Sequence, residues 1–356
     1  MKSYFFKPQL YKNLVRPLLF KLPPETSQKI ADTILDSKIF QILISDSLSI
    51  NNSKLETEFV GIKLNNPVGL AAGYDKNCNH ITALETLGFG YLVCGTIINN
   101  PKEGNPKPRI FRVPKDKALL NSLGFPSQGL NQIIHNLNQN KINNKPLILS
   151  ISGLNIDEII NCYKKLEGFC DAFEINISSP NTQGLKIFQD TQILKKLLIR
   201  LNEIRTKPII VKIPPYTNSK NTLYKSAIYH DKDQIMRILQ TCLEESIDGI
   251  TVSNTTPIVS NNLRSKSGGL SGKPLLENML EIVTDIKHMS GSSIDINACG
   301  GISSGKDVLE AIKAGAKAIQ IYTSLIYEGP RIVKNINKEL LSLLKPNENL
   351  KIINPN

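Results

Sequence analysis

Residues 172–182 read AFEINISSPNT, a short run of apolar and β-branched residues that ends in a cluster of polar ones. Seven further runs have the same character, and helical segments separate most of them. The eight runs cover residues 67–71, 91–95, 147–152, 172–177, 208–213, 249–253, 294–299 and 318–322. Short strands that alternate with helices are typical of βαβ units and a parallel sheet. Eight repeats in one chain predict an α/β fold, the closed (β/α)8 or TIM barrel.

The segments between and after these runs fit the same fold. Helical periodicity indicates helices over residues 190–205, 231–245, 276–288 and 306–314, and a final helix over residues 331–344. Residues 99–125 are too rich in proline, glycine and charge for a simple crossover, so they are expected to form a functional insertion. The polar tail that follows the last helix is expected to be loosely ordered.

The first 45 residues differ from the rest of the chain. Leucine and isoleucine recur at helical spacing on both sides of a break at Pro23 and Pro24, and Thr26 or Ser27 is a candidate helix cap. Two short amphipathic helices are expected. Their aromatic, aliphatic and cationic residues suit a membrane interface, although the pattern alone favours a hairpin packed on its own barrel. The predicted organisation is a helical extension (1–45), a barrel (46–345) and a polar tail (346–356).

Composition narrows the class of protein. Hydrophobic residues make up 40% and charged residues 21%, which indicates a globular protein. The formal net charge of +12 would suit binding to nucleic acid, to an anionic membrane or to anionic small molecules, and compositional drift without a functional role would also explain it. Basic residues form no run of five or six, so no nucleic-acid partner is expected. No 18-residue apolar stretch or signal-peptide pattern occurs, and the six scattered cysteines indicate buried thiols in a reducing compartment, without a metal site.

Polar residues gather directly after the predicted strands, where active sites of such barrels form. They include residues 72–77, Thr96, residues 176–182, Lys212, residues 253–256, residues 300–301 and residues 322–323. The glycines at 300 and 301 let a backbone approach an anion closely, although a plain strand-to-helix turn would also explain them. Residues 268–274 form a second glycine-rich loop. Two such loops favour a phosphorylated cofactor.

Several of these segments resemble the dihydroorotate dehydrogenase family. The resemblance spans about residues 55–340 and is carried by residues 71–77, 104–109, 124–125, 176–182, 253–256, 268–274 and 322–323. It implies FMN as the cofactor and the oxidation of dihydroorotate to orotate in pyrimidine synthesis. The family's catalytic base is serine in the quinone-linked class and cysteine in the soluble class, and the matching residue here is Ser179.

The quinone-linked class implies further properties. The N-terminal extension resembles a helical lid that rests on the membrane and admits quinone to the flavin. A monomeric peripheral membrane protein at the cytoplasmic face of a bacterial-type inner membrane is therefore expected, with dihydroorotate or orotate and a membrane quinone as partners.

The resemblance also implies roles for individual residues. Ser179 removes the proton from C5 of the substrate, and Thr182 and Phe125 flank its proton path. This relay is needed because a hydroxyl is a weak base and none of the four histidines is near Ser179 in sequence. Expected substrate contacts are Lys76, Asn121, Ser122, Leu123, Gly124, Phe125, Asn176, Asn181, Asn254 and Thr255. Expected cofactor contacts are Ala72, Gly73, Lys76, Thr96, Ser150, Asn176, Lys212, Ser253, Gly272, Gly301, Tyr322 and Thr323.

One position departs from the family pattern. The third strand of the family commonly ends in an asparagine that touches the flavin, whereas Ser150 is the matching residue here. The departure affects one expected cofactor contact.

Three other functions compete with this interpretation. A soluble dehydrogenase of the same family would have cysteine at position 179 and would lack the helical lid. A tRNA dihydrouridine synthase would carry an RNA-binding domain after the barrel, and a non-catalytic barrel that binds a phosphorylated ligand would not need Ser179 or Lys76. Flavin colour in the purified protein separates the flavin enzymes from the non-catalytic barrel.

Overall fold

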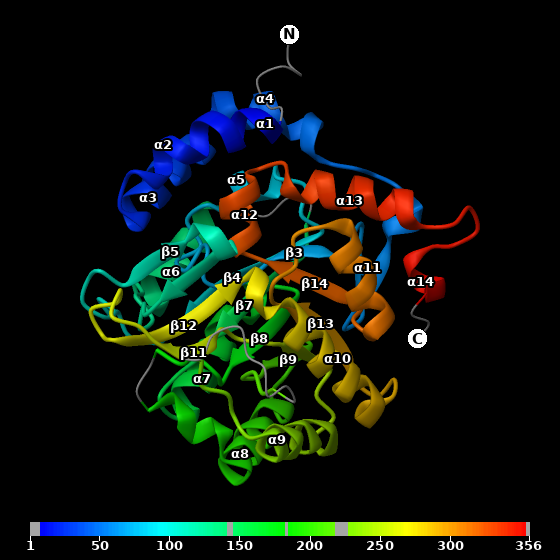
Figure 1. Ribbon diagram of the computed structural model, residues 1–356. Coiled ribbons are helices and arrows are strands. Elements are labelled where there is room, and N and C mark those ends of the chain that lie inside the picture. Colours follow the sequence, from blue (N-terminus) through cyan, green and yellow to red (C-terminus); the bar gives the residue numbers. More distant parts are fainter. Residues whose placement is uncertain (1–7, 141–144, 182–183, 218–226, 354–356) are drawn as a thin grey trace.

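The computed structural model describes residues 8–140, 145–181, 184–217 and 227–353. Eight parallel strands close into a barrel (Figure 1), which confirms the predicted (β/α)8 fold. Each predicted run contains one barrel strand. In chain order, the strands are β3 (Val68–Leu70), β4 (Tyr91–Ile97), β7 (Leu147–Ile151), β8 (Ala172–Asn176), β9 (Ile209–Lys212), β10 (Gly249–Val252), β13 (Asp295–Cys299) and β14 (Ala318–Ile321).

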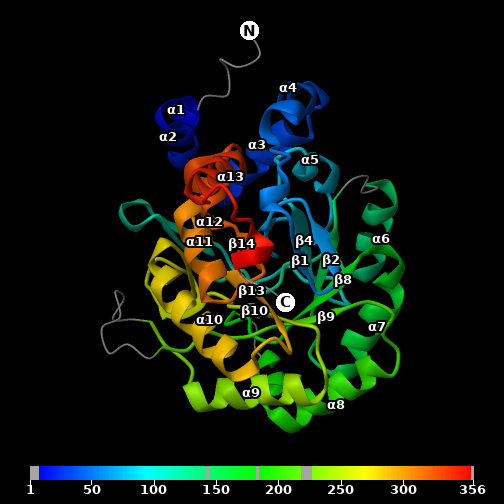
Figure 2. The ribbon, with the colours of Figure 1, turned by 90° about the vertical axis from the view of Figure 1, so that its right-hand side faces the viewer.

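Helices cover the outside of the barrel (Figure 2), and the five helices predicted by residue range are confirmed to within a few residues. Helix α8 shows the local cause. The Asp190 carboxylate caps its first turn by accepting from the Gln192 and Ile193 amides, and leucines at a spacing of three or four residues face the core. The surrounding helices are α5 (Ile81–Glu85), α6 (Leu130–Gln139), α7 (Ile156–Leu166), α8 (Thr191–Asn202), α9 (Lys232–Glu244), α10 (Leu276–Ser290), α11 (Gly305–Ala314) and α13 (Ile332–Leu343).

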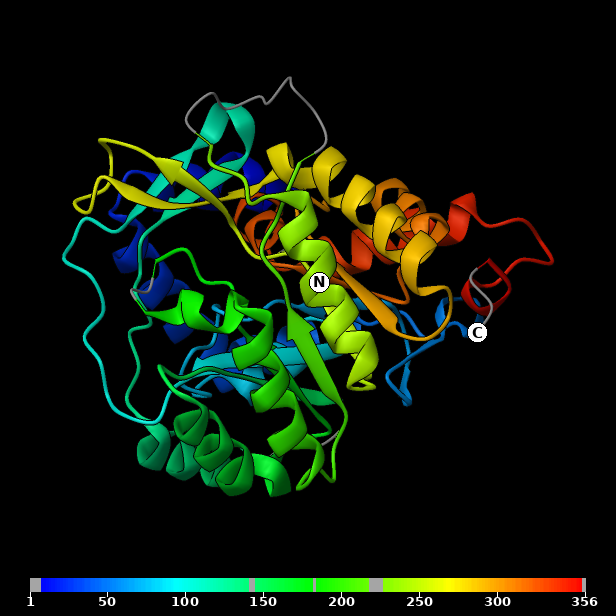
Figure 3. The same cartoon turned by 90° about the horizontal axis from the view of Figure 1, so that it is seen from below.

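The insertion predicted over residues 99–125 forms half of a small sheet at the carboxyl ends of the barrel strands. Its strands β5 (Ile110–Val113) and β6 (Ala118–Asn121) form one hairpin, and β11 (Thr256–Val259) and β12 (Ser267–Gly272) form another. The two hairpins join through β6 and β12, which gives the antiparallel order β11-β12-β6-β5. Figure 3 shows these strands together at one side of the barrel. The hairpin β1 (Thr57–Phe59) and β2 (Ile62–Leu64) packs against Tyr91 and Asp295 instead. The small sheet, and not this hairpin, therefore lies at the carboxyl ends of the barrel strands and contributes to the pocket there.

The N-terminal helices lie above the barrel, beside α12 (Thr323–Glu328) and β5 (Figure 1). The first is α1 (Pro8–Leu10), which continues through a π-helical turn, Tyr11–Val15, into α2 (Arg16–Phe20). Helix α3 (Pro24–Asp36) follows, and α4 (Lys38–Leu48) is a third helix that the sequence analysis did not predict. No helix within the described ranges has the length and apolar character needed to cross a membrane.

Two expectations about the ends of the chain were wrong. The N-cap of α3 is Pro23, without a side-chain cap, and the Ser27 hydroxyl instead donates to the Leu19 carbonyl at 2.6 Å. The tail is also not loose throughout, since residues Leu350–Ile353 form helix α14 and Leu350 is buried. An apolar side chain that finds a place in the core overrides the polar composition of its neighbours.

Candidate active site

A pocket of about 190 Å³ lies between the carboxyl ends of the barrel strands and the small sheet. Most of the residues predicted for the site line it, although they come from segments far apart in the chain. They are Ala72, Gly73, Lys76, Thr96, Asn121, Leu123, Gly124, Phe125, Asn176, Ser179, Asn181, Lys212, Ser253, Asn254, Thr255, Gly272, Gly301, Tyr322 and Thr323. The polar strand ends therefore meet at one place.

Three predicted residues are not found in the lining. Ser150 is fully buried behind Thr96, and the hydroxyl oxygens of the two residues are 3.1 Å apart. Ser122 is buried as well, and its hydroxyl has no hydrogen-bond partner among the described residues. Thr182 lies outside the described residues. Direct ligand contacts for these residues stay predictions.

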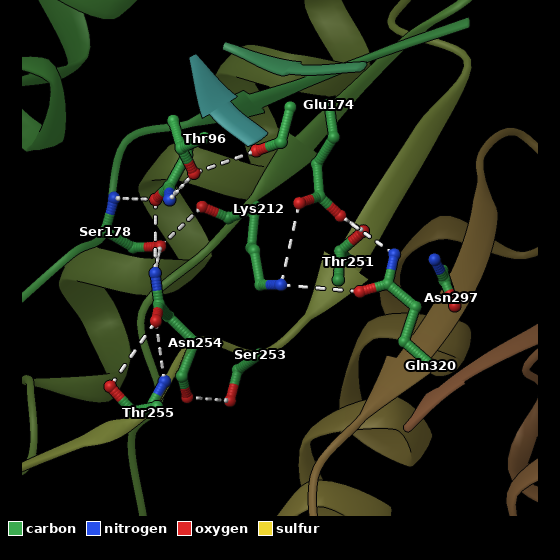
Figure 4. A network of polar contacts seen from close by, with 12 residues as sticks. Thr96, Glu174, Ser178, Lys212, Thr251, Ser253, Asn254, Thr255, Asn297 and Gln320 are labelled. Atoms are coloured by element: carbon green, nitrogen blue, oxygen red, sulfur yellow. Dashed lines mark hydrogen bonds and ion pairs between the residues drawn. The ribbon is translucent and has the colours of Figure 1, made fainter. Parts of the chain in front are cut away.

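Amide side chains at the mouth hold one another in place (Figure 4). Asn176 donates to the Thr96 hydroxyl at 2.9 Å and accepts from the Asn254 amide at 3.1 Å. Asn254 also donates to the Ser178 hydroxyl at 3.1 Å, which in turn donates to the Lys212 carbonyl at 2.7 Å. Such a network fixes the orientation of each amide before a ligand arrives.

A second group of amides lies on the side of the small sheet. Asn181 donates to the Asn121 side chain at 2.8 Å, while its own buried carbonyl oxygen accepts no hydrogen bond from the described residues. A buried acceptor without a partner is costly, so this atom suits an N–H group of a ligand. Nearby, Phe125 has a φ of 55°, a left-handed conformation that costs energy for a bulky residue and that is frequent at functional sites.

Two lysines line the pocket. Lys76 donates to the Gly73 carbonyl at 2.5 Å, and burial lowers the pKa of its ammonium to about 8. Burial also acts to lower the pKa of Lys212, but the neighbouring Cys299, once its thiol is ionised, and Glu174 outweigh burial, so that the pKa of Lys212 is raised; near neutral pH Glu174 supplies the negative charge. Both side chains are therefore cationic near neutral pH and suit an anionic ligand.

Ser179 lies in the loop after β8, lines the pocket and is only half-buried. The lining that the structure describes contains no histidine. A Ser-His pair is therefore not formed within this part of the chain, and proton transfer from Ser179 requires another route.

The pocket fits a planar, phosphorylated cofactor. An added Cβ at Gly73 would meet nothing within 4 Å, so this backbone leaves room for a flat ring. At Gly301 the backbone approaches α10 so closely that a Cβ would come within 2.5 Å of the Leu276 nitrogen. The Thr323 hydroxyl is 2.9 Å from that of Ser271, and the buried Ser324 hydroxyl has no partner among the described residues. Hydroxyls and glycine backbones of this kind are typical phosphate donors.

Sequence reasoning missed several residues of this region. Lys117, Ser271, Lys273, Gln320 and Ser324 line the pocket, and Glu174 lies behind it. Gln320 and Glu174 had a visible signal, because each interrupts an apolar strand. Lys117 had none, since a lysine in a polar loop is usually a surface charge, whereas Ser271 and Lys273 belong to the glycine-rich loop 268–274 that the sequence had already indicated.

A second, mostly apolar cavity of about 290 Å³ lies between the N-terminal helices and the barrel. Its few polar side chains include Tyr11, Gln28 and Arg112. The two cavities share four lining residues, which are Ile110, Leu119, Tyr322 and Glu328. The first pocket is the more polar of the two and is called the polar pocket below; it and the apolar cavity thus lie on either side of a common wall.

A pocket lined by polar side chains at the carboxyl ends of eight parallel strands is typical of TIM-barrel enzymes. The family model for dihydroorotate dehydrogenase matches residues 54–344. The chain is 34% identical over 354 residues to a dihydroorotate dehydrogenase (quinone) of Christiangramia forsetii, covering 93% of this chain and 99% of that protein. It is 37% identical over 344 residues to that of Sulfurimonas denitrificans, with coverages of 93% and 94%.

Solved structures agree with the sequence comparisons. The ligand-free dihydroorotate dehydrogenase (DHODH) of Eimeria tenella is 30% identical, with a TM-score of 0.78 over 92% of this chain and 98% of that one. The chain belongs to the dihydroorotate dehydrogenase family, which oxidises dihydroorotate in pyrimidine biosynthesis. It is therefore an oxidoreductase.

Proposed function

We propose that this enzyme oxidises dihydroorotate to orotate with bound FMN and passes the electrons to a membrane quinone. The observation that carries the proposal is the pair of adjoining cavities, one polar and one apolar, with Tyr322 in the wall between them. A charged pyrimidine needs the first environment and a quinone needs the second.

The polar pocket would hold FMN and the substrate together. Gly73, Gly301 and Thr323 would hold the cofactor, and when bound, FMN supplies the acceptor for the hydride that leaves C6 of dihydroorotate. The substrate carboxylate would pair with an ammonium such as that of Lys76, and the ring would lie among the amides. Asn121, Asn181 and Asn254 present donors and acceptors that match a cyclic imide edge.

Ser179 would remove the proton from C5. Ser179 belongs to the pocket lining, and its half-exposure leaves access for water. Because a hydroxyl is a weak base, the proton must pass on from Ser179, and Phe125 and Thr182 would flank that path. Lys212 would stabilise negative charge that develops at the pyrimidine end of the flavin, where a preorganised cation is most effective.

The apolar cavity would admit the quinone. Arg112 borders it with its guanidinium 4.6 Å from the centre of the Phe20 ring, and Tyr11 and Gln28 add further polar atoms that suit a quinone carbonyl. Leu14 and Leu18 on the outer surface are 55% and 56% exposed, and Ile39 and Ile42 are more exposed still. Exposed apolar side chains on amphipathic helices fit peripheral contact with a membrane, at the cytoplasmic face of a bacterial-type inner membrane. We propose that the enzyme acts there as a monomer.

Anaerobic mixing tests the proposal. The purified protein should be yellow, and dihydroorotate should bleach the flavin absorbance. A soluble quinone analogue should then restore the colour, whereas fumarate should not. Colourless protein that takes up no FMN would contradict the cofactor, and recovery with fumarate alone would assign the chain to the soluble class.

A further inference from the structure

A buried ion pair lies at the bottom of the polar pocket. Glu174 on β8 and Lys212 on the neighbouring strand β9 are 1% and 5% exposed, and the Lys212 ammonium is 3.5 Å from one carboxylate oxygen, Oε1 (Figure 4). In the other ion pairs of the described residues, at least one side chain is more than 10% exposed. Burial of two charges is costly, and apolar residues commonly replace such pairs without loss of stability. A role beyond stability is therefore indicated.

The surrounding side chains fix the carboxylate from one side. The other oxygen, Oε2, accepts from the Thr251 hydroxyl at 2.9 Å and from the Gln320 amide at 3.0 Å. The first oxygen has no hydrogen bond among the described residues and faces only the ammonium of Lys212. The carboxylate is thus held so that its uncommitted oxygen points at the lysine.

The two charges differ in their access to the pocket. Lys212 and Gln320 line it, whereas Glu174 does not. The contacts of the ammonium within the protein are long, at 3.4 Å to the Gln320 oxygen and 3.5 Å to Glu174. An ammonium has three donors, so Lys212 retains the capacity to donate to a ligand. Any effect of Glu174 on a ligand therefore reaches it across Lys212 or Gln320, and of these two only Lys212 is charged.

We propose that Glu174 is a positioning residue that keeps Lys212 charged at the bottom of the pocket and offsets its positive charge, thereby setting the reduction potential of bound FMN. The proposal rests on the proposed FMN function. Reduction adds negative charge to the flavin, and a nearby cation favours it. A carboxylate beside that cation reduces the benefit, because the interaction between charges a few ångströms apart is strong at a buried site.

Other titratable groups lie near the pair. Cys299 on β13 borders Lys212, and Tyr91 on β4 is close enough to Glu174 for the carboxylate to affect its ionisation. Burial raises the pKa of both the Cys299 thiol and the Tyr91 hydroxyl, so both groups are neutral near pH 7. Glu174 is then the charge that balances Lys212.

Glu174→Gln tests the proposal because it removes the charge and keeps the shape. We expect the midpoint potential of bound FMN at pH 6 to rise by about 30 mV or more, equivalent to a tenfold change for a two-electron couple. The gain should shrink towards pH 9, because without the carboxylate burial lowers the pKa of Lys212 and the cation is lost. The matched control is Tyr91→Phe, a neutral change in the same barrel interior, which should leave the potential unchanged.

No shift or a downward shift at pH 6, or an equal shift in Tyr91→Phe, would overturn the proposal. If Glu174→Gln does not fold, the double variant Glu174→Leu/Thr251→Val removes the same charge together with the hydroxyl that would lose its partner, and the same upward shift is expected. A wild-type protein without flavin would instead contradict the proposed function. Yellow wild-type protein with an unshifted variant would contradict this inference alone.

Discussion

The mouth of the barrel and the N-terminal helices are built in opposite ways. At the mouth, polar side chains from different strands hydrogen bond to one another, as Asn176 does with Thr96 and Asn254. The N-terminal helices present leucines to the outside, and their polar contacts lie on the opposite side, toward the barrel, including Tyr11 to the Ile326 carbonyl, Arg16 to the Tyr327 carbonyl and Glu25 to Arg109. A site that positions a small polar substrate needs many mutual constraints, whereas a surface that meets lipid needs few.

Deletion of residues 1–40 should separate the two regions most completely. Turnover with a quinone should be abolished, because α2 and α3 form much of the apolar cavity wall. Flavin bleaching by dihydroorotate should continue, because the deleted residues do not line the polar pocket. Stopped-flow and steady-state assays in detergent would measure both steps, and unchanged quinone kinetics would contradict the role of the helices.

Ser179→Ala should produce the reverse pattern. We expect flavin binding to persist and bleaching by dihydroorotate to slow by about 10³-fold, within the usual range for loss of a general base. Reoxidation of flavin reduced with dithionite should keep its wild-type rate, because Ser179 does not line the apolar cavity. Bleaching at a near-normal rate would remove Ser179 from this role.

Ala31→Trp tests the apolar cavity within the intact chain. Ala31 on α3 lines this cavity, so the larger side chain should raise the KM for quinone about tenfold, equivalent to about 1.4 kcal/mol. The rate of bleaching should not change. Ile42→Trp places the same side chain at an exposed position outside the cavity and serves as the control. Equal effects of both variants would argue against quinone access through this space.

The attachment of α3 should weaken as pH rises. His80 contacts Asp36 at 2.9 Å. Burial acts to lower the pKa of His80, but the carboxylates of Asp36, Asp75 and Asp32 near the histidine outweigh burial, so that the pKa is raised. Burial raises the pKa of Asp32 to about 6. Both groups bind protons more tightly in the docked state, so their stabilisation is present at low pH. The stabilisation from Asp32 is lost as the pH rises from about 4 through about 6. The stabilisation from His80 is lost as the pH rises through the raised pKa of the histidine.

Proteolysis measures this attachment. Cleavage within α3 should be faster at pH 8 than at pH 5.5, by a factor of no more than about five, since partly exposed pairs contribute at most about 1 kcal/mol. His80→Gln should remove the part of the pH dependence that belongs to the histidine. Cleavage that becomes faster at low pH would contradict the assigned direction.

The same contrast explains what the sequence could predict. The barrel strands and their polar ends follow from local periodicity, because every strand end of a closed parallel barrel lies on one side. The small sheet could not be predicted, since its two hairpins join through β6 and β12, which are about 150 residues apart, as Leu120 and Leu270 are. Pairing over such distances leaves no local pattern. The Glu174–Lys212 pair could not be predicted because it depends on which way the two side chains point inside the barrel. Helix α4 could not be predicted because its residues Phe40 and Leu48 are placed by packing against the core.

Tyr322 has a consequence for natural variation in this enzyme. Its ring belongs to the single layer of side chains between the polar pocket and the apolar cavity, and it packs at 5.7 Å from the ring of Tyr74. A replacement in this layer alters both compartments at once. Under the proposed function, the shared layer is therefore where the pyrimidine site and the quinone site constrain each other's evolution.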